Sequence, residues 1–285
     1  MKTLKEYILE ADKNGTAIGH FNIANIETMW GVFNAARNLD VPVIIGVSEG
    51  ERDFIGIKQS VVLIRSLREE FDFPVFLNAD HSYSFDRVKE AIDAGFDMVI
   101  YDGSNLPYDE NVDISKRCAD YAAQSPNDVL VEAELGFIGS GSNVKESIPE
   151  GVSEETQTKP NDALEFIKAT GVDLLAPSVG NIHGIVKSGN PQLNIQRIKD
   201  IRETAGVPLV LHGGSGSSDE DFVHAAHAGM SIIHISTELR LGYLESLKAS
   251  LEETKEIAPY KYLKKPRKEI ERIVEARIKL FSGIK

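Results

Sequence analysis

Three of the chain's seven histidines stand at or just beyond the ends of short apolar runs: His81, His183 and His212. If these runs are parallel strands of one sheet, their carboxyl ends meet and the three imidazoles converge. Three neutral imidazoles leave a coordination position of Zn²⁺ open to water or substrate, which is the arrangement of a catalytic zinc site. A single histidine at such a position is more often a core or rim residue than a metal ligand. Three at corresponding positions favour a metal site.

Carboxylates accompany these histidines. Asp80 directly precedes His81, where it can act as a general acid–base or as a hydrogen-bond partner of an imidazole. Asp102 and Glu134 lie at the ends of the next two apolar runs, and they suit a second divalent or monovalent cation, or the positioning of a water molecule. Hydrogen-bonded rim carboxylates without a cation explain the same pattern equally well.

An anion site is predicted immediately after His212. The residues Gly213-Gly214-Ser215-Gly216 offer exposed backbone N–H groups, and Ser236-Thr237 opens a helix near the end of the chain. Backbone N–H groups at glycine turns and helix starts bind phosphate, and barrels often bind phosphate after their last two strands. We therefore expect the metal and phosphate sites to meet at His212.

Apolar runs alternate with helical patterns along the whole chain, which predicts a (β/α)8 barrel. The eight expected strands are Ala17–Ile23, Val41–Ser48, Pro74–His81, Met98–Gly103, Val129–Gly136, Asp173–Gly180, Pro208–Gly214 and Ser231–Thr237. The helical patterns cover 3–14, 26–39, 53–71, 84–95, 111–125, 160–170, 194–205, 218–228, 237–255 and 265–281. A doubly wound open sheet is the alternative, but no Gly-x-Gly-x-x-Gly pattern follows the first strand.

We expect one barrel domain over residues 1–285, because no linker or low-complexity segment divides the chain. The net charge of −13 argues against a nucleic-acid partner, which requires a basic surface. No apolar run approaches the ~20 residues that span a bilayer, so a membrane is not expected. The single cysteine, Cys118, fits a reducing compartment, and we expect a cytoplasmic protein.

The other histidines differ in their expected surroundings. His234 lies in the last strand run and is predicted to face the barrel mouth, whereas His20 faces the interior or its rim. His224 and His227 belong to an outer helix and should be exposed. The segment Phe137–Lys159 is long, lacks periodicity and is therefore expected to be functional or mobile.

With these residues in place, the chain resembles the class II, zinc-dependent fructose-bisphosphate/tagatose-bisphosphate aldolase family. The resemblance runs from Gly19-His20-Phe21-Asn22 to Ser236-Thr237-Glu238-Leu239. Its most specific stretches are Ala79-Asp80-His81, Tyr101-Asp102-Gly103-Ser104, Val131-Glu132-Ala133-Glu134-Leu135-Gly136, Gly180-Asn181-Ile182-His183-Gly184 and Leu211-His212-Gly213-Gly214-Ser215-Gly216.

The resemblance implies a role for each matched residue. It makes His81, His183 and His212 ligands of a catalytic zinc ion, Asp80 the acid–base, and Asp102 and Glu134 ligands of a second metal. The implied substrate-binding residues are Asn22, Ser48, Gly184, Gly213, Gly214, Ser215, His234, Ile235, Ser236 and Thr237. Ser48 would contact the aldehyde half of the substrate. The dihydroxyacetone-phosphate half would be contacted by Gly184, Gly213–Ser215 and residues 234–237.

The implied reaction is reversible cleavage of a ketose 1,6-bisphosphate, of fructose or tagatose type, to dihydroxyacetone phosphate and glyceraldehyde 3-phosphate. Such cleavage develops negative charge on the carbon beside a carbonyl group. Either a metal ion bound to the carbonyl oxygen or a lysine Schiff base stabilises this charge. No lysine lies in the eight strand runs, so the metal route is favoured. The resemblance and the apolar C-terminal helix also favour a homodimer or homotetramer.

Three departures from the family pattern leave other functions open. The phosphate-side motif lacks the family's lysine, so phosphate binding would depend on backbone N–H groups. The substrate-binding asparagine of the last strand is His234 here, and the loop glutamate that moves a proton is Ser142, with Glu146 nearby. One alternative is a metal-dependent lyase or isomerase acting on another phosphorylated sugar. Another is a catalytically impaired homologue that binds sugar phosphates.

Overall fold

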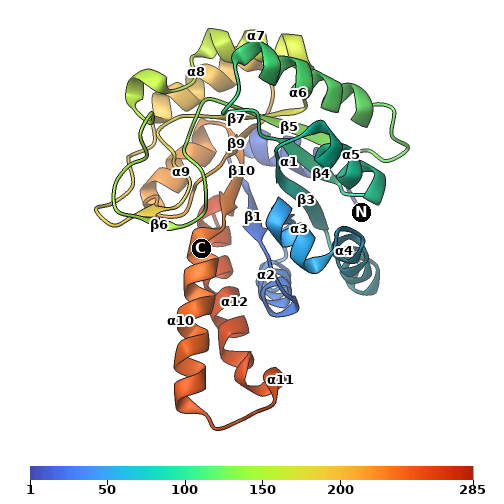
Figure 1. Ribbon diagram of the computed structural model, residues 1–285, viewed down its shortest axis with the longest axis vertical. Helices are drawn as coiled ribbons and strands as arrows, with labels where there is room; N and C mark the ends of the chain where they lie inside the picture. Colours follow the sequence, from blue (N-terminus) through green and yellow to red (C-terminus); the bar gives the residue numbers. More distant parts are fainter. Residues whose placement is uncertain (285) are drawn as a thin grey trace.

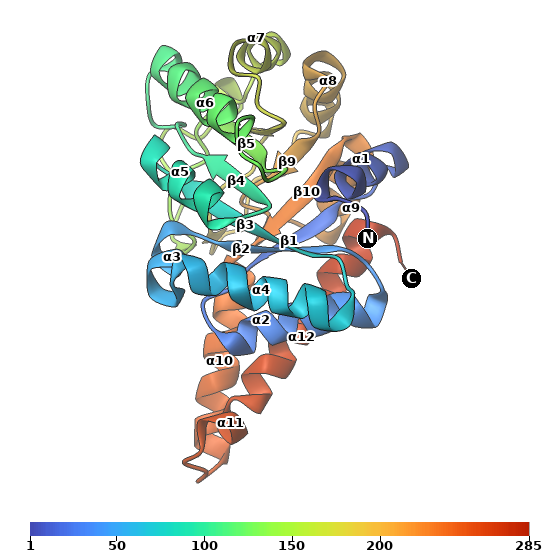
Figure 2. The ribbon, with the colours of Figure 1, turned by 90° about the vertical axis from the view of Figure 1, so that its right-hand side faces the viewer.

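The computed structural model describes residues 1–284, and over that range eight parallel strands close into a barrel (Figure 2). Around the barrel the strand order is β1-β10-β9-β7-β5-β4-β3-β2, so the first strand pairs with both the last and the second. The strands are β1 Ile18–Asn22, β2 Val43–Val47, β3 Val75–Ser82, β4 Met98–Tyr101, β5 Leu130–Leu135, β7 Leu174–Pro177, β9 Leu209–Leu211 and β10 Met230–Ile235. The predicted (β/α)8 barrel is confirmed, and closure excludes the open-sheet alternative.

Helices surround the strands on the outside (Figure 1). They are α1 Leu4–Asn14, α2 Ile26–Leu39, α3 Glu49–Ile55, α4 Ile57–Phe71, α5 Phe85–Ala94, α6 Tyr108–Ala122, α7 Pro160–Thr170, α8 Ile195–Ala205, α9 Asp219–Ala228, α10 Thr237–Glu253, α11 Pro259–Tyr262 and α12 Lys264–Ser282. The single helix predicted over 53–71 is wrong: α3 and α4 are separate. They meet at Gly56, whose backbone φ of 98° is not helical.

Apolar side chains fill two regions of the barrel. One set packs between the strands and the outer helices, and the other fills the interior near the strand starts. Helix α1 covers that end of the barrel with Leu4, Ile8 and Ala11, which pack among the interior residues. The end at which the strands start is therefore closed by the core, and the carboxyl ends of the strands are left to form a site.

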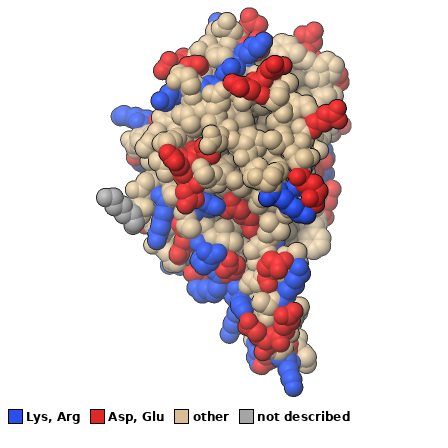
Figure 3. All heavy atoms as spheres, turned by 90° about the vertical axis from the view of Figure 1, so that its left-hand side faces the viewer, with Lys and Arg blue, Asp and Glu red and all other residues tan. Residues whose placement is uncertain are grey.

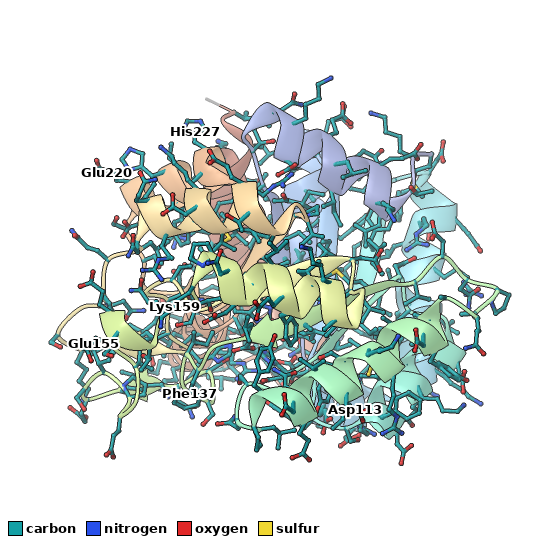
Figure 4. All side chains as sticks on the ribbon, turned by 90° about the horizontal axis from the view of Figure 1, so that it is seen from above. Asp113, Phe137, Glu155, Lys159, Glu220 and His227 are labelled. Carbon is teal, nitrogen blue, oxygen red and sulfur yellow. The ribbon has the colours of Figure 1, made fainter. Side chains whose placement is uncertain are left out.

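The loops that follow β5 and β7 are joined to each other. Within the long segment 137–159, the short strand β6 Val144–Lys145 pairs with β8 Ile185–Val186 of the later loop. Figure 4 shows Phe137 and Lys159, which bracket this segment, on one side of the barrel. The expected irregular loop therefore has structure of its own, and it is tied to the loop that carries His183.

Helices α10, α11 and α12 form an arm that projects from the barrel (Figures 1 and 2). Lysines, arginines, aspartates and glutamates are interspersed on its surface (Figure 3). Several large apolar side chains of the arm are exposed, among them Leu244, Leu251, Ile257 and Tyr260. None of the helices within residues 1–284 combines the length and apolar character needed to cross a bilayer.

Candidate active site

Asp80 and His81 both face the barrel mouth, although neighbouring residues of a regular strand face opposite sides. His81 has a left-handed backbone conformation with φ of 45°, and the pairing of β3 with β4 shifts register between Ala79 and Ser82. This irregularity turns the imidazole back over the barrel end. His81 Nε2 and Asp80 Oδ1 are consequently 3.9 Å apart.

The three predicted metal ligands come together at this mouth. One ring nitrogen from each of His81, His183 and His212 lies within 4.8 Å of the others. His81 Nε2 and His212 Nδ1 are 3.1 Å apart, close to the ~3.3 Å expected between two nitrogens on a tetrahedral zinc ion. His183 lies in the loop beyond β7, whereas His212 directly follows β9.

Each of these imidazoles is held by an oxygen on its outer nitrogen. The acceptors are Asp102 Oδ2 at 3.0 Å from His81 Nδ1, the Gly139 carbonyl at 2.8 Å from His183 Nδ1, and Glu132 Oε1 at 2.7 Å from His212 Nε2. A proton on each outer nitrogen leaves the lone pair of the inner nitrogen free for a metal. The donor set therefore fits a divalent metal ion.

Burial and mutual repulsion set the charges of these rings. Burial, with repulsion from His81, lowers the pKa of both His183 and His212 to about 3, so both are neutral. Burial opposes the charged form of His81 too, but Asp80, Asp102 and Glu134 outweigh it and raise its pKa to about 10. A metal ion that binds His81 would therefore displace a proton.

Asp80 is buried and ionised. Its Oδ2 accepts a hydrogen bond from Asn22 Nδ2 at 2.8 Å, and its Oδ1 lies 3.4 Å from His234 Nδ1. Burial would raise its pKa, but the neighbouring His81 and His234 hold the pKa well below the usual range. The carboxylate can thus accept a proton at the mouth of the barrel.

The two carboxylates expected to hold a second cation lie on the Nδ1 side of His81. Asp102 Oδ2 is 3.0 Å and Glu134 Oε2 is 3.7 Å from that nitrogen. Burial and the nearby Asp102 raise the pKa of Glu134 well above its usual value. Among the described residues Glu134 Oε2 has no hydrogen-bond partner, so this oxygen can take either a proton or a cation.

Beneath the mouth, His20 and His234 extend a polar cluster into the barrel. Their rings stack with centroids 3.5 Å apart, and Asn78 Nδ2 lies 3.1 Å from His20 Nε2. A Cβ atom at Gly46 would come within 2.1 Å of His20 Cε1, so β2 needs glycine there. His20 is buried as predicted, and His227 is exposed on α9 (Figure 4).

Two adjoining cavities open at the mouth. The inner one, of about 20 Å³, is lined by Asn22, Asp80, His81, Ser142, His183, Gly184, His212, Gly213, Ser215, His234, Ser236 and Thr237. The outer one, of about 220 Å³, shares several of these residues and adds Ser48. Gly214 and Ile235 line neither; Ile235 packs in the apolar layer beneath the helices.

Sequence reasoning missed several residues of this site. The Glu132 carboxylate and the Gly139 carbonyl hold two of the imidazoles. Glu51 accepts hydrogen bonds from Asn22 Nδ2 at 2.9 Å and from the Arg240 guanidinium at 2.7 Å. A signal existed for Glu51, because Ser48-x-x-Glu51 is a capping box at the start of α3. Glu132 stands two residues before Glu134 and therefore shares its face of β5.

The three imidazoles and the adjacent carboxylates form a candidate metal site at the mouth of a (β/α)8 barrel. The model of the family Fructose-bisphosphate aldolase class-II matches residues 2–284. A fructose-bisphosphate aldolase of Staphylococcus aureus is 35% identical over 283 residues, covering 98% of this chain and 96% of the relative. The fructose-bisphosphate aldolase of Geobacillus stearothermophilus is 38% identical over 252 residues, covering 87% of this chain and 85% of the relative.

Solved structures agree with this assignment. The crystal structure of the YdjI aldolase from Escherichia coli K12 is similar with a TM-score of 0.82 and 31% identity, covering 98% of this chain and 96% of that one. The chain belongs to the class II fructose-bisphosphate aldolase family. It is a lyase of the aldolase type, as its sequence predicted.

Proposed function

We propose that this protein catalyses reversible aldol cleavage of a ketose 1,6-bisphosphate, of fructose or tagatose type, to dihydroxyacetone phosphate and glyceraldehyde 3-phosphate. The metal we propose is zinc, held by His81, His183 and His212. The observation that carries the proposal is the oxygen acceptor on the outer nitrogen of each ring, which leaves three inner nitrogens facing one another. When bound, the ion supplies Lewis-acid polarisation of the substrate carbonyl.

The chain's own residues would carry the proton and hold the substrate. Asp80 is the proposed acid–base, because its ionised carboxylate lines both cavities. Asn22 orients it through the bond to Oδ2. In cleavage, Asp80 takes the proton of the hydroxyl whose carbon becomes the aldehyde; in condensation it returns that proton.

The phosphate of the dihydroxyacetone half would bind at the inner cavity. Gly213 and Ser215 line it beside the start of α10, where Ser236 and Thr237 lie. Backbone N–H groups at a glycine turn and at a helix start favour an anion. Gly214 and Ile235 would support this loop through their backbones, and Ser48 would contact the aldehyde half. Asp102 and Glu134 are proposed to hold a second cation.

Metal removal tests the proposed function. The chelated protein should lose cleavage of fructose 1,6-bisphosphate and tagatose 1,6-bisphosphate, and Zn²⁺ or Co²⁺ should restore it. Comparison of the two bisphosphates identifies the stereochemistry at C4. Undiminished cleavage after the zinc content has fallen to background would contradict a metal-dependent mechanism.

A second candidate is a metal-dependent lyase for another phosphorylated sugar, which His234 and Ser142 favour. Glu146 does not replace the missing loop glutamate in this conformation, because it is exposed and pairs with Lys187. A His234→Asn variant assayed beside the native protein on a panel of sugar phosphates separates the two. If only the variant cleaves the 1,6-bisphosphates, the native substrate is a different sugar.

We also propose that the protein is a homodimer or homotetramer, since exposed Leu251 and Ile257 give the arm apolar contacts to bury. Sedimentation of the native protein beside Ile257→Asp measures the state directly. A monomeric native protein would contradict this proposal. A cytoplasmic location stays a prediction.

A further inference from the structure

We propose that Arg52 is a positioning residue, which holds the irregular end of β3 in the shape that brings Asp80 and His81 to one space. Arg52 lines neither cavity at the mouth and belongs to none of the candidate metal clusters. It therefore acts through its hydrogen bonds to the strand ends. The inference rests on the proposed function and deepens it, because the proposed metal ligand and the proposed proton carrier both depend on this shape.

The end of β3 lacks the regular pairing that holds a parallel strand in place. The register of β3 with β4 breaks between Ala79 and Ser82, so the two residues between them stand outside the pairing with β4. One of the two, His81, has a φ of 45°, which is strained for a residue with a Cβ atom. Strain of this kind persists only where surrounding contacts hold it. Contacts other than the pairing with β4 must therefore hold Asp80 and His81.

The guanidinium of Arg52 supplies such contacts on both sides of His81. Its Nη1 donates to the Asp80 carbonyl at 3.2 Å, and its Nη2 donates to Ser82 Oγ at 3.0 Å. Nη1 also donates to the Val47 carbonyl at 2.8 Å, at the end of β2. Three acceptors on two strands match the planar, forked donors of an arginine, whereas a lysine concentrates its donors at one point. One side chain thus ties the end of β2 to the two residues that flank His81.

Helix α3 fixes the position of this guanidinium. The capping box of Ser48 and Glu51 sets the start of the helix, and the Arg52 N–H donates to the Ser48 carbonyl at 2.8 Å. Only 1% of Arg52 is exposed, so water does not compete for its donors. Burial lowers the pKa of Arg52, but a guanidinium stays protonated in proteins, and the neighbouring carboxylates favour its charge. The bridge from α3 to β3 is therefore made at any pH at which the protein is folded.

A general contribution to stability is the competing explanation, and Arg68 provides the comparison. Its Nε donates to the Val75 carbonyl at 2.9 Å, at the start of β3, and it pairs with Asp97. Arg52 and Arg68 thus bond the backbone of the same strand at opposite ends. If Arg52 only stabilised the barrel, loss of either arginine would lower the free energy of unfolding and leave the site unchanged. Positioning predicts that loss of Arg52 alone alters metal binding and turnover.

The test compares Arg52→Gln with Arg68→Gln in measurements of zinc affinity and cleavage. Arg52→Gln should bind Zn²⁺ about 10- to 100-fold more weakly in competition with a chelating dye. At saturating zinc, its kcat for the preferred 1,6-bisphosphate should fall about 10- to 100-fold, with KM little changed, because the phosphate-binding loops are not touched. Arg52→Lys should recover part of both losses. Arg68→Gln, the matched control, should keep the native affinity and kcat even if its urea unfolding midpoint falls.

Hydrogen exchange of the metal-free protein tests the inference without zinc or substrate. Backbone amides in peptides that span residues 79–83 should exchange about tenfold faster or more in Arg52→Gln than in the native protein, while the start of β3 keeps its protection. Should Arg52→Gln fail to fold, Arg52→Lys carries the same comparison, since it keeps the charge and loses the fork.

Native zinc affinity and kcat in Arg52→Gln, or unchanged exchange at residues 79–83, overturns the positioning role. Equal losses of zinc affinity in the Arg52 and Arg68 variants also overturn it, since they indicate general destabilisation. If the native protein binds no zinc and cleaves neither bisphosphate, the proposed function fails. The exchange measurement alone then decides whether Arg52 holds the end of β3.

Discussion

The imidazole rings of His20 and His234 lie face to face, with centroids 3.5 Å apart and planes 4° from parallel. The two residues are direct neighbours in the pairing of β1 with β10. Both rings are buried, and two charged imidazoles cannot stack at this distance away from water. The fold is therefore compatible with a charge on one of the two rings at most.

Acid should destabilise the protein through His20. Burial lowers the pKa of His20 from 6.5 to about 4, so between these values the unfolded chain binds a proton that the native state does not. Stability therefore rises with pH in that window, and about 3 kcal/mol is lost as the pH falls from 6.5 to 4. Urea unfolding with chelator present should show a flatter pH dependence for His20→Asn. An unchanged slope would contradict the role of His20, and His224→Asn, on exposed α9, is the control.

Removing the Asp80 carboxylate should separate turnover from metal binding. Asp80→Ala should lose about 10²- to 10⁴-fold in kcat, since it deletes the proposed proton carrier, while the zinc content stays near that of the native protein. Steady-state kinetics and metal analysis of the same preparation measure both quantities. Asp113→Ala, on the exposed face of α6, should behave like the native protein (Figure 4). Loss of zinc together with activity would mean that Asp80 serves the metal site instead.

The support that Glu132 gives to His212 should be measurable as metal affinity. Glu132→Leu removes the acceptor at Nε2, and the affinity for Zn²⁺ should fall about 10- to 100-fold. Glu132→Gln keeps an acceptor oxygen and should retain most of the affinity. Competition with a chelating dye measures each value. Equal weakening by both substitutions would point to a packing defect.

Gly213 should tolerate no side chain, for two independent reasons. Its φ is 62°, and a Cβ atom there would lie 2.2 Å from the Ile182 carbonyl oxygen. Gly171 has a similar φ of 71° but open space around its Cβ position, so Gly171→Ala measures the backbone strain alone, about 1–2 kcal/mol. Gly213→Ala should cost more in urea unfolding and should also weaken metal binding, since Ile182 precedes His183. Equal costs for the two variants would show that the close contact relaxes.

The sequence predicted the barrel well because each unit repeats one physical pattern. Apolar runs that are buried on both faces alternate with amphipathic helices, and glycines end many of those helices. Gly95, Gly171, Gly206 and Gly229 each directly follow a helix, and each has the left-handed conformation that favours glycine at this position. The break at Gly56 was missed because the apolar periodicity continues across it.

The site was harder to predict wherever contacts come from distant segments. His81, His183 and His212 were found because each lies at or just beyond the end of a strand run. Their acceptors were not, since Gly139 contributes only a carbonyl, which leaves no side-chain signal. Arg240 was missed for another reason: a single arginine on an outer helix is usually a solvated residue, and only the fold places it beside the cavity.

The left-handed conformation of His81 has a consequence for how this enzyme can change. Because one backbone irregularity turns Asp80 and His81 toward the same space, the proposed proton carrier and the proposed metal ligand cannot be adjusted separately. An insertion or deletion in β3 would move both together. Variation in substrate preference is therefore expected to accumulate on the other side of the mouth, along the outer cavity, where Ser48 and Arg240 stand on separate elements.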